Sequence, residues 1–314
     1  MHSRLKTSLI IIAIFSCIVF SILPIFSSEY ILILILSMFV YIGYSIAWNI
    51  MSGLTGYVNF GFAAFVGVGS YASVLLITDL KMWWPLAWLC GGLASLLLAI
   101  ILGSFMLKLR GSYFAIGMLS LLLGIKLLFS SKYLAFITRG GHGLSFIEPL
   151  DTKMMYYAIF VMTILSVIVS YKVITSKFGA RLIAIREDEE GAASIGINTT
   201  KEKLFAFGLS AFLAGAIASG HIAYQNYIEP DSAFHGQWTI VPIVMVLLGG
   251  PGTVIGPIIG AIVLTLVEEL LWSHFTQAYM IIYGIIMILL VMLMPGGVIE
   301  WLKGKDILPK HRGI

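Results

Sequence analysis

Long apolar stretches separated by short polar ones run through most of this chain. Six of them hold 20 residues or more, at 7–27, 30–50, 83–107, 154–174, 204–224 and 277–296. An α-helix needs roughly 20 mainly apolar residues to cross the hydrocarbon core of a bilayer. The pattern therefore predicts membrane-spanning helices at these six places.

Three further apolar stretches are shorter or rich in glycine and proline. They lie at 60–78, at 112–130, and in the pair 238–249 and 253–267. Interrupted helices are tolerated inside a membrane only where protein or a water-filled cavity satisfies the freed backbone groups. We therefore expect short, broken or tightly packed helices there.

The composition excludes an ordinary soluble domain. Hydrophobic residues make up 60% of the 314 positions and charged residues only 11%, whereas soluble domains carry about 25% charged residues. The first apolar stretch follows basic residues as a signal peptide would, but no small-residue cleavage site follows it, so we interpret it as a membrane helix. The fold class predicted is an all-α integral membrane protein, a polytopic helical bundle of about eight to ten spans with some short or broken helices.

The basic residues indicate the orientation of this bundle. Most of the 19 lie in four clusters, at Arg4 and Lys6, at Lys108 and Arg110, between Lys172 and Lys203, and between Lys303 and Arg312. Positive charge marks the cytoplasmic ends of membrane helices. About ten spans place all four clusters inside, so both termini are predicted to be cytoplasmic in a multi-pass protein of the cell membrane.

The segment 175–203 is the one sizeable charged loop on that side, and its residues suggest structure. Acidic residues precede Ala192, Ile195 and Gly196, and these three would share one face if residues 187–195 are helical. A short helix with small residues on one face can enter a groove on another protein closely, and an acidic first turn suits the helix dipole. An amphipathic loop lying on the membrane is the alternative.

Within this segment, Glu190-Gly-Ala-Ala-Ser-Ile-Gly196 resembles the glutamate-alanine-alanine motif of ABC importer permeases, with Gly191 at the first alanine position. Wider stretches resemble the branched-chain amino acid permease family, most closely its larger, M-type subunit. They are Gly179–Asp188, Trp48–Gly61, Ala63–Tyr71, Leu109–Ala115, Lys203–Phe207, Gly249–Pro257 and Met294–Gly297. The resemblance covers roughly residues 30–300 in the same order.

The resemblance implies a single transmembrane permease domain over 1–314, with 175–203 as a cytoplasmic loop that couples it to ATPase subunits. The coupling residues it implies are Arg181, Ala184, Arg186, Glu187, Asp188, Glu190, Ala192, Ala193 and Gly196. It also implies three kinds of partner besides lipid: a second homologous permease, two ATP-binding subunits and an external substrate-binding protein. No nucleic-acid partner is expected. ATP and Mg would bind in the ATPase subunits, so no cofactor is expected on this chain.

Polar residues within the first glycine-rich region suggest a passage for solute. The candidates are Asn49, Gly53, Gly56, Asn59 and Gly61. A buried amide needs hydrogen-bond partners, which either a neighbouring helix or a passing amino acid could supply. The family usually has serine-leucine-glycine-histidine where this chain has Asn59-Phe-Gly-Phe62, so the solute is left open.

The expected function is uptake of leucine, isoleucine and valine, driven by ATP hydrolysis in partner subunits. A permease for urea or short-chain amides, and an ion-coupled secondary amino acid transporter, are the alternatives. The chain has no G-x-x-x-x-G-K-[ST] phosphate loop, so we expect a transport subunit without its own ATPase and no catalytic residues. The histidines lack metal-ligand spacing, so no metal site is expected.

Overall fold

The structure is a computed structural model that describes residues 18–139, 143–145, 151–275, 278–293 and 297. These residues are almost entirely helical, and the predicted fold class is confirmed. The first group of helices comprises α2 (Glu29–Trp48), which continues as the π-helical turn η1 (Asn49–Gly53), and α3 (Phe62–Thr78), α4 (Trp84–Met106), α5 (Ser112–Ser130) and α6 (Ala135–Thr138). Residues 18–26 are also helical.

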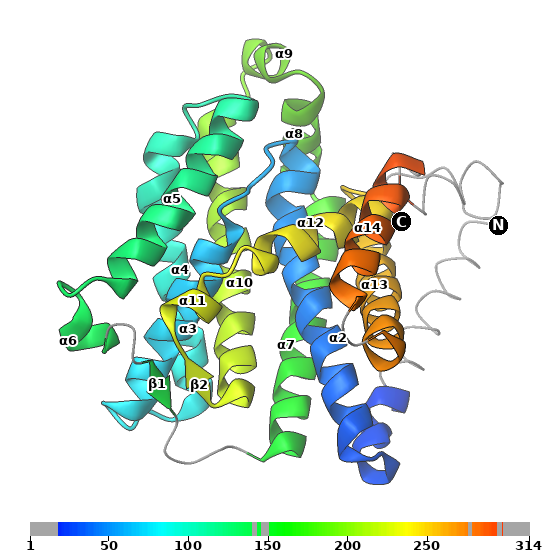
Figure 1. Cartoon of the computed structure of the whole chain (residues 1–314). Coiled ribbons are helices and arrows are strands. Elements are labelled where there is room, and N and C mark those ends of the chain that lie inside the picture. Colours follow the sequence, from blue (N-terminus) through cyan, green and yellow to red (C-terminus); the bar gives the residue numbers. More distant parts are fainter. Residues whose placement is uncertain (1–17, 140–142, 146–150, 276–277, 294–296, 298–314) are drawn as a thin grey trace.

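The remaining helices follow a short strand, β1 (Leu144–Ser145). They are α7 (Thr152–Thr175), α8 (Lys177–Glu187), α9 (Glu189–Ser194), α10 (Thr199–Gln225), α11 (Pro230–Ala233), α12 (Gln237–Gly249), α13 (Ile255–His274) and α14 (Tyr279–Leu293). Strand β2 (Tyr227–Ile228) pairs antiparallel with β1, with Leu144 opposite Ile228. This small sheet and α9 lie at opposite ends of the molecule (Figure 1).

Seven helical segments of the described chain are long and apolar enough to cross a membrane. They are Glu29–Gly53, Trp84–Met106, Ser112–Ser130, Thr152–Thr175, Thr199–Gln225, Pro230–Gly249 and Ile255–His274. Helix α3 is apolar but shorter. The predicted span at 7–27 is described only from residue 18, and the edges of the span at 277–296 also lie outside the described residues.

The break predicted between 238–249 and 253–267 is present, but the helix that follows it is longer than predicted. Helix α12 has 13 residues, which at 1.5 Å per residue extend only about 20 Å. Helix α13 does not stop at 267 and continues to His274. The hydropathy pattern did not indicate this extension, because Glu268 and Glu269 interrupt the apolar stretch near its end.

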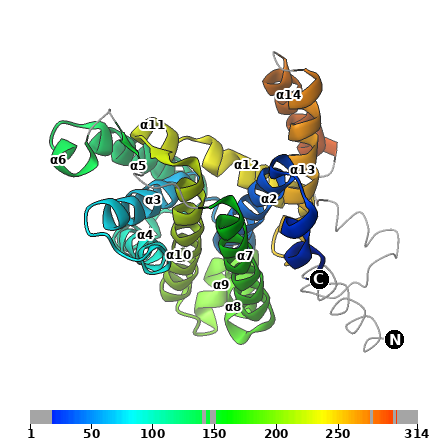
Figure 2. The same cartoon turned by 90° about the horizontal axis from the view of Figure 1, so that it is seen from below.

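Glycines allow the central helices to pack closely. Helix α10 packs against α3 and α4 in the middle of the bundle, whereas α13 and α14 lie on the far side of α2 (Figure 2). A Cβ atom at Gly69 of α3 would lie 2.4 Å from the Cα of Gly215 in α10. Helix backbones meet this closely in membranes where small residues face one another.

Polar side chains inside the bundle bond between helices. Ser95 donates a hydrogen bond to the carbonyl oxygen of Phe65 at 2.7 Å, and Thr163 donates one to that of Phe39 at 2.9 Å. The ammonium of Lys126, within the apolar helix α5, lies 2.8 Å from the Asp231 carboxylate of α11. These contacts satisfy polar groups that lipid would leave unpaired.

Candidate functional site

Helices α8 and α9 form one end of the molecule, which we call the α9 end (Figure 1). Three short polar side chains start the three successive helices of this region. The side chains of Ser176, Asp188 and Asn198 accept hydrogen bonds from backbone N–H groups in the first turns of α8, α9 and α10, respectively. Such N-caps satisfy donors that a helix start leaves unpaired, so the loop is an ordered structure.

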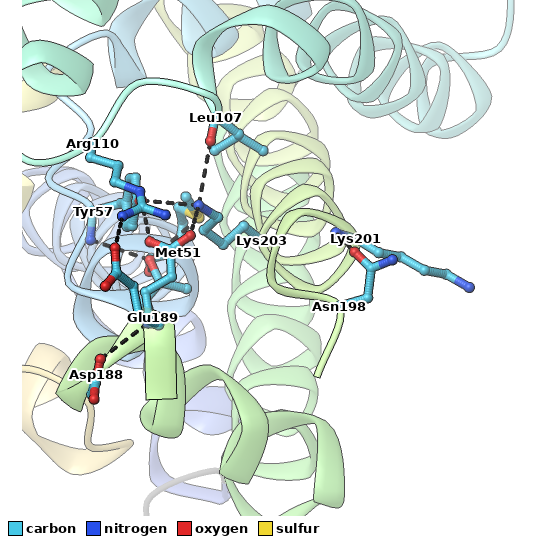
Figure 3. Close-up of polar contacts among 11 residues, drawn as sticks. Met51, Tyr57, Leu107, Arg110, Asp188, Glu189, Asn198, Lys201 and Lys203 are labelled. Atoms are coloured by element: carbon cyan, nitrogen blue, oxygen red, sulfur yellow. Dashed lines mark hydrogen bonds and ion pairs between the residues drawn. The ribbon is translucent and has the colours of Figure 1, made fainter. Parts of the chain in front are cut away.

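A buried polar network ties α9 to the bundle (Figure 3). The ammonium of Lys203, on α10, donates hydrogen bonds to Glu189 Oε1 at 2.6 Å and to the Tyr57 hydroxyl at 2.9 Å. It also lies 3.3 Å from the carbonyl oxygen of Leu107. The Tyr57 hydroxyl donates in turn to Glu189 Oε2. Because the Lys203 side chain is only 2% exposed, these contacts hold the first residue of α9 against three separate segments.

The network shifts the ionisation of both of its acidic groups. Burial, and then the hydrogen bond and negative charge of Glu189, raise the pKa of the Tyr57 hydroxyl well above its usual value. Burial alone would raise the pKa of the Glu189 carboxyl, but the hydrogen bonds from Lys203 and Tyr57 and the ammonium charge lower it overall. At neutral pH the site therefore holds a neutral tyrosine and an ionised glutamate.

Two further ion pairs brace the same region from outside. Arg110 Nη1 lies 2.7 Å from Glu190 Oε1, with both side chains exposed. Arg181 Nε of α8 lies 2.7 Å from Glu202 Oε1 of α10. The first pair is exposed and contributes little to stability, and the second is half-buried but joins α8, not α9, to α10. We therefore assign the main fixation of α9 to the Lys203–Glu189–Tyr57 network.

Arg186 connects α8 to the end of η1. Its Nη1 donates a hydrogen bond to the carbonyl oxygen of Gly53 at 2.9 Å. A Cβ atom at Gly56 or at Gly252 would lie 3.3 Å or 3.2 Å from the Arg186 side chain. Both glycines have positive φ, +76° and +78°, which is accessible to glycine at little steric cost. One arginine thus contacts the two turns that reverse the chain after η1 and after α12.

Asn49 joins the same two turns from within the bundle. Its side-chain oxygen accepts from the N–H of Gly252 at 2.8 Å, and its side-chain nitrogen donates to the carbonyl oxygen of Thr253 at 2.8 Å. A Cβ atom at Gly53 would collide with the Asn49 side chain and with the backbone of Gly252. The oxygen and the nitrogen of the Asn49 side chain, which was predicted to line the pathway, are therefore both bonded to backbone groups of the protein.

The other predicted pathway residues also make close backbone contacts. Asn59 is fully buried, and its side-chain oxygen accepts from the N–H of Gly61 at 2.9 Å. A Cβ atom at Gly61 would lie 2.4 Å from the carbonyl oxygen of Met118. These contacts account for the glycine and for the oxygen of the Asn59 amide, whereas its side-chain nitrogen is buried without a partner among the described residues. A role in solute passage stays a prediction.

The predicted coupling residues divide by exposure. Arg186, Glu187, Asp188, Glu190, Ala193 and Gly196 are exposed at the α9 end, and Arg181 and Ala184 are half-buried. The expectation that Ala192, Ile195 and Gly196 share an outward face was wrong. Ala192 is buried whereas Ile195 is 75% exposed, because α9 ends at Ser194 and the chain turns there.

Three residues of the network were not singled out by the sequence analysis: Tyr57, Glu189 and Lys203. Glu189 is one of four consecutive acids, and nothing local distinguishes it from its neighbours. The available signal was Lys203, a lysine placed directly before an apolar stretch. A charge in such a position needs a partner.

The family that matches this chain and the relatives described below are all transport permeases. Residues 30–291 match the family described as branched-chain amino acid transport system / permease component. The high-affinity branched-chain amino acid transport system permease proteins LivM of Salmonella typhimurium and Escherichia coli are each 28% identical over 297 residues, covering 83% of this chain and 68% of the relative. The autoinducer 2 import system permease protein LsrC of Salmonella typhi is 30% identical over 66% of this chain and 62% of its own length. No solved structure matches.

Proposed function

Because the chain belongs to the family of branched-chain amino acid transport permease components, we propose that it is the membrane-spanning subunit of an ATP-driven importer that takes up leucine, isoleucine and valine. The observation that carries this proposal is the anchoring of α9. A six-residue helix at the end of the bundle is held by the buried Lys203–Glu189–Tyr57 network and exposes its other side. A surface that is anchored on one side and exposed on the other suits docking of another subunit.

In this proposal the exposed surface of α9 and the following turn contacts an ATP-binding subunit. Ile195 supplies an exposed apolar side chain, and Glu190 and Ala193 are exposed as well. Movement of α9 reaches α10 through the Glu189–Lys203 contact and reaches η1 through the Arg186–Gly53 contact. The chain makes no covalent bond to solute; it switches a solute pathway between the two sides of the membrane.

The assembly has further parts that this chain requires as a transport subunit. They are a second homologous permease, a pair of ATP-binding subunits that hold ATP and Mg, and an external binding protein that delivers the amino acid. Residues 1–314 act as one permease domain, with 175–203 as its coupling loop. We propose that its α9 end, which carries the basic residues Lys108 and Arg110 and those between Lys172 and Lys203, is cytoplasmic, because positive charge marks cytoplasmic ends. The basic residues near both ends of the sequence place the termini on the same side in this proposal.

The test is purification of the chain with its natural partners from native membranes. ATP hydrolysis is then measured with and without binding protein loaded with leucine. We expect ATP-binding subunits to co-purify and loaded binding protein to stimulate hydrolysis. Purification without an ATPase, together with uptake driven only by an imposed sodium or proton gradient, would support the ion-coupled alternative.

A variant pair tests the docking surface itself. Ile195→Arg places a charge on the exposed residue that follows α9, and we expect it to reduce ATPase co-purification and uptake several-fold. Leu80→Arg is the control, because Leu80 is similarly exposed, at 67%, but lies at the opposite end of α3 from Tyr57. Equal loss in the two variants would count against docking at α9.

The solute is tested separately, because the chain is also similar to permeases of an import system for autoinducer 2. Uptake of leucine, isoleucine and valine should compete mutually in the reconstituted complex, whereas urea and acetamide should not compete. Stimulation of hydrolysis by a urea-binding or amide-binding partner would move the assignment to that alternative.

A further inference from the structure

A crevice lies between α2 and α13, near the ends that face away from α9. It has a volume of about 310 Å³, at the small end of the range typical of small-molecule sites. Ser37 and Tyr41 line it from α2, and Thr265, Glu268 and Trp272 line it from α13. The spacings of four residues on α2 and of three and four on α13 place each set on one face of its helix. The two faces thus oppose each other along the crevice.

The carboxylate of Glu268 in this crevice has no hydrogen-bond or ion-pair partner among the described residues. Its neighbour Glu269 differs, because it accepts a hydrogen bond from the Tyr30 hydroxyl. No lysine or arginine side chain is among the described residues that line the crevice. An ionisable residue within a membrane-spanning helix is costly unless it has a partner or is protonated. A positive group in the crevice would stabilise the ionised form of Glu268.

A second observation points to a ligand independently. The hydroxyl oxygen of Thr265 is buried and has no hydrogen-bond partner within the described structure. Threonine in a helix ordinarily bonds back to a carbonyl of the preceding turn, and a buried hydroxyl without a partner costs free energy. Thr265 is also one of the residues lining the crevice, so a ligand there would supply the missing partner.

From these contacts we propose that the crevice binds a zwitterionic amino acid with an apolar side chain, with its ammonium group at Glu268. The hydroxyls of Ser37 and Thr265 would donate to the carboxylate. Trp272 and the apolar residues Ile33 and Leu34 would contact the side chain. Aromatic rings beside the carboxylate also favour an organic ammonium over a bare metal ion.

This proposal rests on the proposed function for the identity of the ligand, and it places a substrate site in the permease itself. The crevice lies at the end away from α9, which is the external side in that function. It is therefore suited to receive solute released at the outer face.

The test measures direct binding to the purified full complex in lipid nanodiscs, without ATP and without binding protein. Three probes separate the recognised groups: leucine, n-pentylammonium, which lacks the carboxylate, and 4-methylpentanoate, which lacks the ammonium. We expect leucine to bind and n-pentylammonium to displace it, while 4-methylpentanoate does not. Because this competition uses the unaltered chain, its result holds even if a substitution impairs folding.

Variants then assign the residues. Glu268→Gln should weaken leucine and n-pentylammonium at least tenfold, whereas Thr265→Val should weaken leucine more than n-pentylammonium. Glu29→Gln is the matched control, because Glu29 is an exposed carboxylate in the first turn of α2 and does not line the crevice. It should bind as the unaltered chain does.

The outcomes separate this inference from the proposed function. ATP-driven leucine uptake without measurable leucine or n-pentylammonium binding would overturn the crevice and leave the function standing. Leucine binding unchanged by Glu268→Gln would also overturn it. Binding of n-pentylammonium that depends on Glu268, in a complex that neither binds nor imports leucine, would support an ammonium site and contradict the proposed solute.

Discussion

Lys203 shows how one side chain can fix a functional surface. A lysine ammonium removed from water loses several kcal/mol of hydration, which its partners must offset. Here a carboxylate, a phenol and a backbone carbonyl each lie within hydrogen-bond distance of it. Its ammonium is also 4.3 Å from the centre of the Tyr57 ring, a geometry that adds a cation–π attraction.

Removing the ammonium should therefore release α9. Lys203→Met leaves Glu189 half-buried without its cation, and breaking a buried pair from one side costs about 3–5 kcal/mol. We expect a lower melting temperature and loss of solute-stimulated ATP hydrolysis, with partial recovery in Lys203→Met/Glu189→Gln. Arg110→Ala is the control, since it breaks the exposed pair with Glu190 and should change melting little. Similar melting of the two single variants would contradict the assignment.

Acidification should reproduce part of this effect. The folded-state pKa of Glu189 lies below its ordinary value of 4.5, so its ionised form favours folding. That stability is present above the unfolded-state pKa and is lost as the pH falls through the folded-state pKa. The melting difference between the unaltered chain and Glu189→Gln should hold from pH 7 to about 5 and shrink below 4.5. A constant difference down to pH 3.5 would contradict it.

At the residue scale the sequence predicted where the site lies better than which atoms form it. The family motif located Glu190, Ala193 and Gly196 at the α9 end, where the structure exposes them. It could not identify Tyr57, because residues 57 and 189 meet only when α3, α9 and α10 pack together. Helical periodicity placed Ala192 on one face with Ile195 and Gly196, but a six-residue helix offers too few turns for periodicity to fix its orientation.

At the scale of elements, capping residues decide how the charged loop divides. Asp188 ends α8 and starts α9, and its side chain accepts from the N–H groups of Glu190 and Gly191 at 3.1 and 3.0 Å. A Cβ atom at residue 191 would lie 2.5 Å from that carboxylate. The tight cap gives a physical reason for glycine where the family motif has alanine.

The turn after α9 depends on Gly196 in a similar way. Its φ is +88°, and no atom lies within 4 Å of a Cβ built there, so a substitution is opposed by backbone strain and not by crowding. We expect Gly196→Ala to cost about 1–2 kcal/mol locally and to increase hydrogen exchange in α9. Gly196→Asn should be milder, because asparagine tolerates positive φ better. Equal exchange in the two variants would mean that the strain is absorbed elsewhere.

Close helix contacts give a second prediction at this scale. Gly69→Ala places a methyl group against the backbone of Gly215, and overpacking of this kind costs about 1–3 kcal/mol. Gly124→Ala in α5 is the matched control, since nothing lies within 4 Å of its Cβ position. Alanine is favoured over glycine in a helix by about 1 kcal/mol, so this control should be neutral or stabilising. Thermal unfolding in detergent distinguishes them, and an equal loss would contradict the packing argument.

At the scale of the whole molecule, hydropathy predicted the architecture because lipid imposes one requirement on every span. The stretches at 30–50, 83–107, 154–174 and 204–224 correspond closely to α2, α4, α7 and α10. The sequence was less informative for α12 and α13. Their lengths depend on the turn held by Asn49 and Gly252, a contact between residues about 200 positions apart.

The proposed orientation can be checked on intact cells. In a chain with Cys17 and Cys90 replaced by serine, Ser194→Cys and Lys132→Cys supply single thiols near opposite ends, both at exposed positions. We expect a membrane-impermeant maleimide to label Lys132→Cys in intact cells and Ser194→Cys only after permeabilisation. The reverse pattern would place α9 outside and contradict docking of an ATPase there.

The ion pair between Lys126 and Asp231 has a consequence for how the protein is made. The ribosome delivers α5 to the membrane roughly a hundred residues before it delivers α11, an interval of about 5–20 s at ordinary rates of synthesis. During that time the lysine lacks its carboxylate and can only extend its ammonium towards the lipid headgroups. We therefore expect the nascent α5 to keep this ammonium at the headgroups until Asp231 can reach it. Pairing of Lys126 is thus a late step in synthesis, although α5 itself is made early.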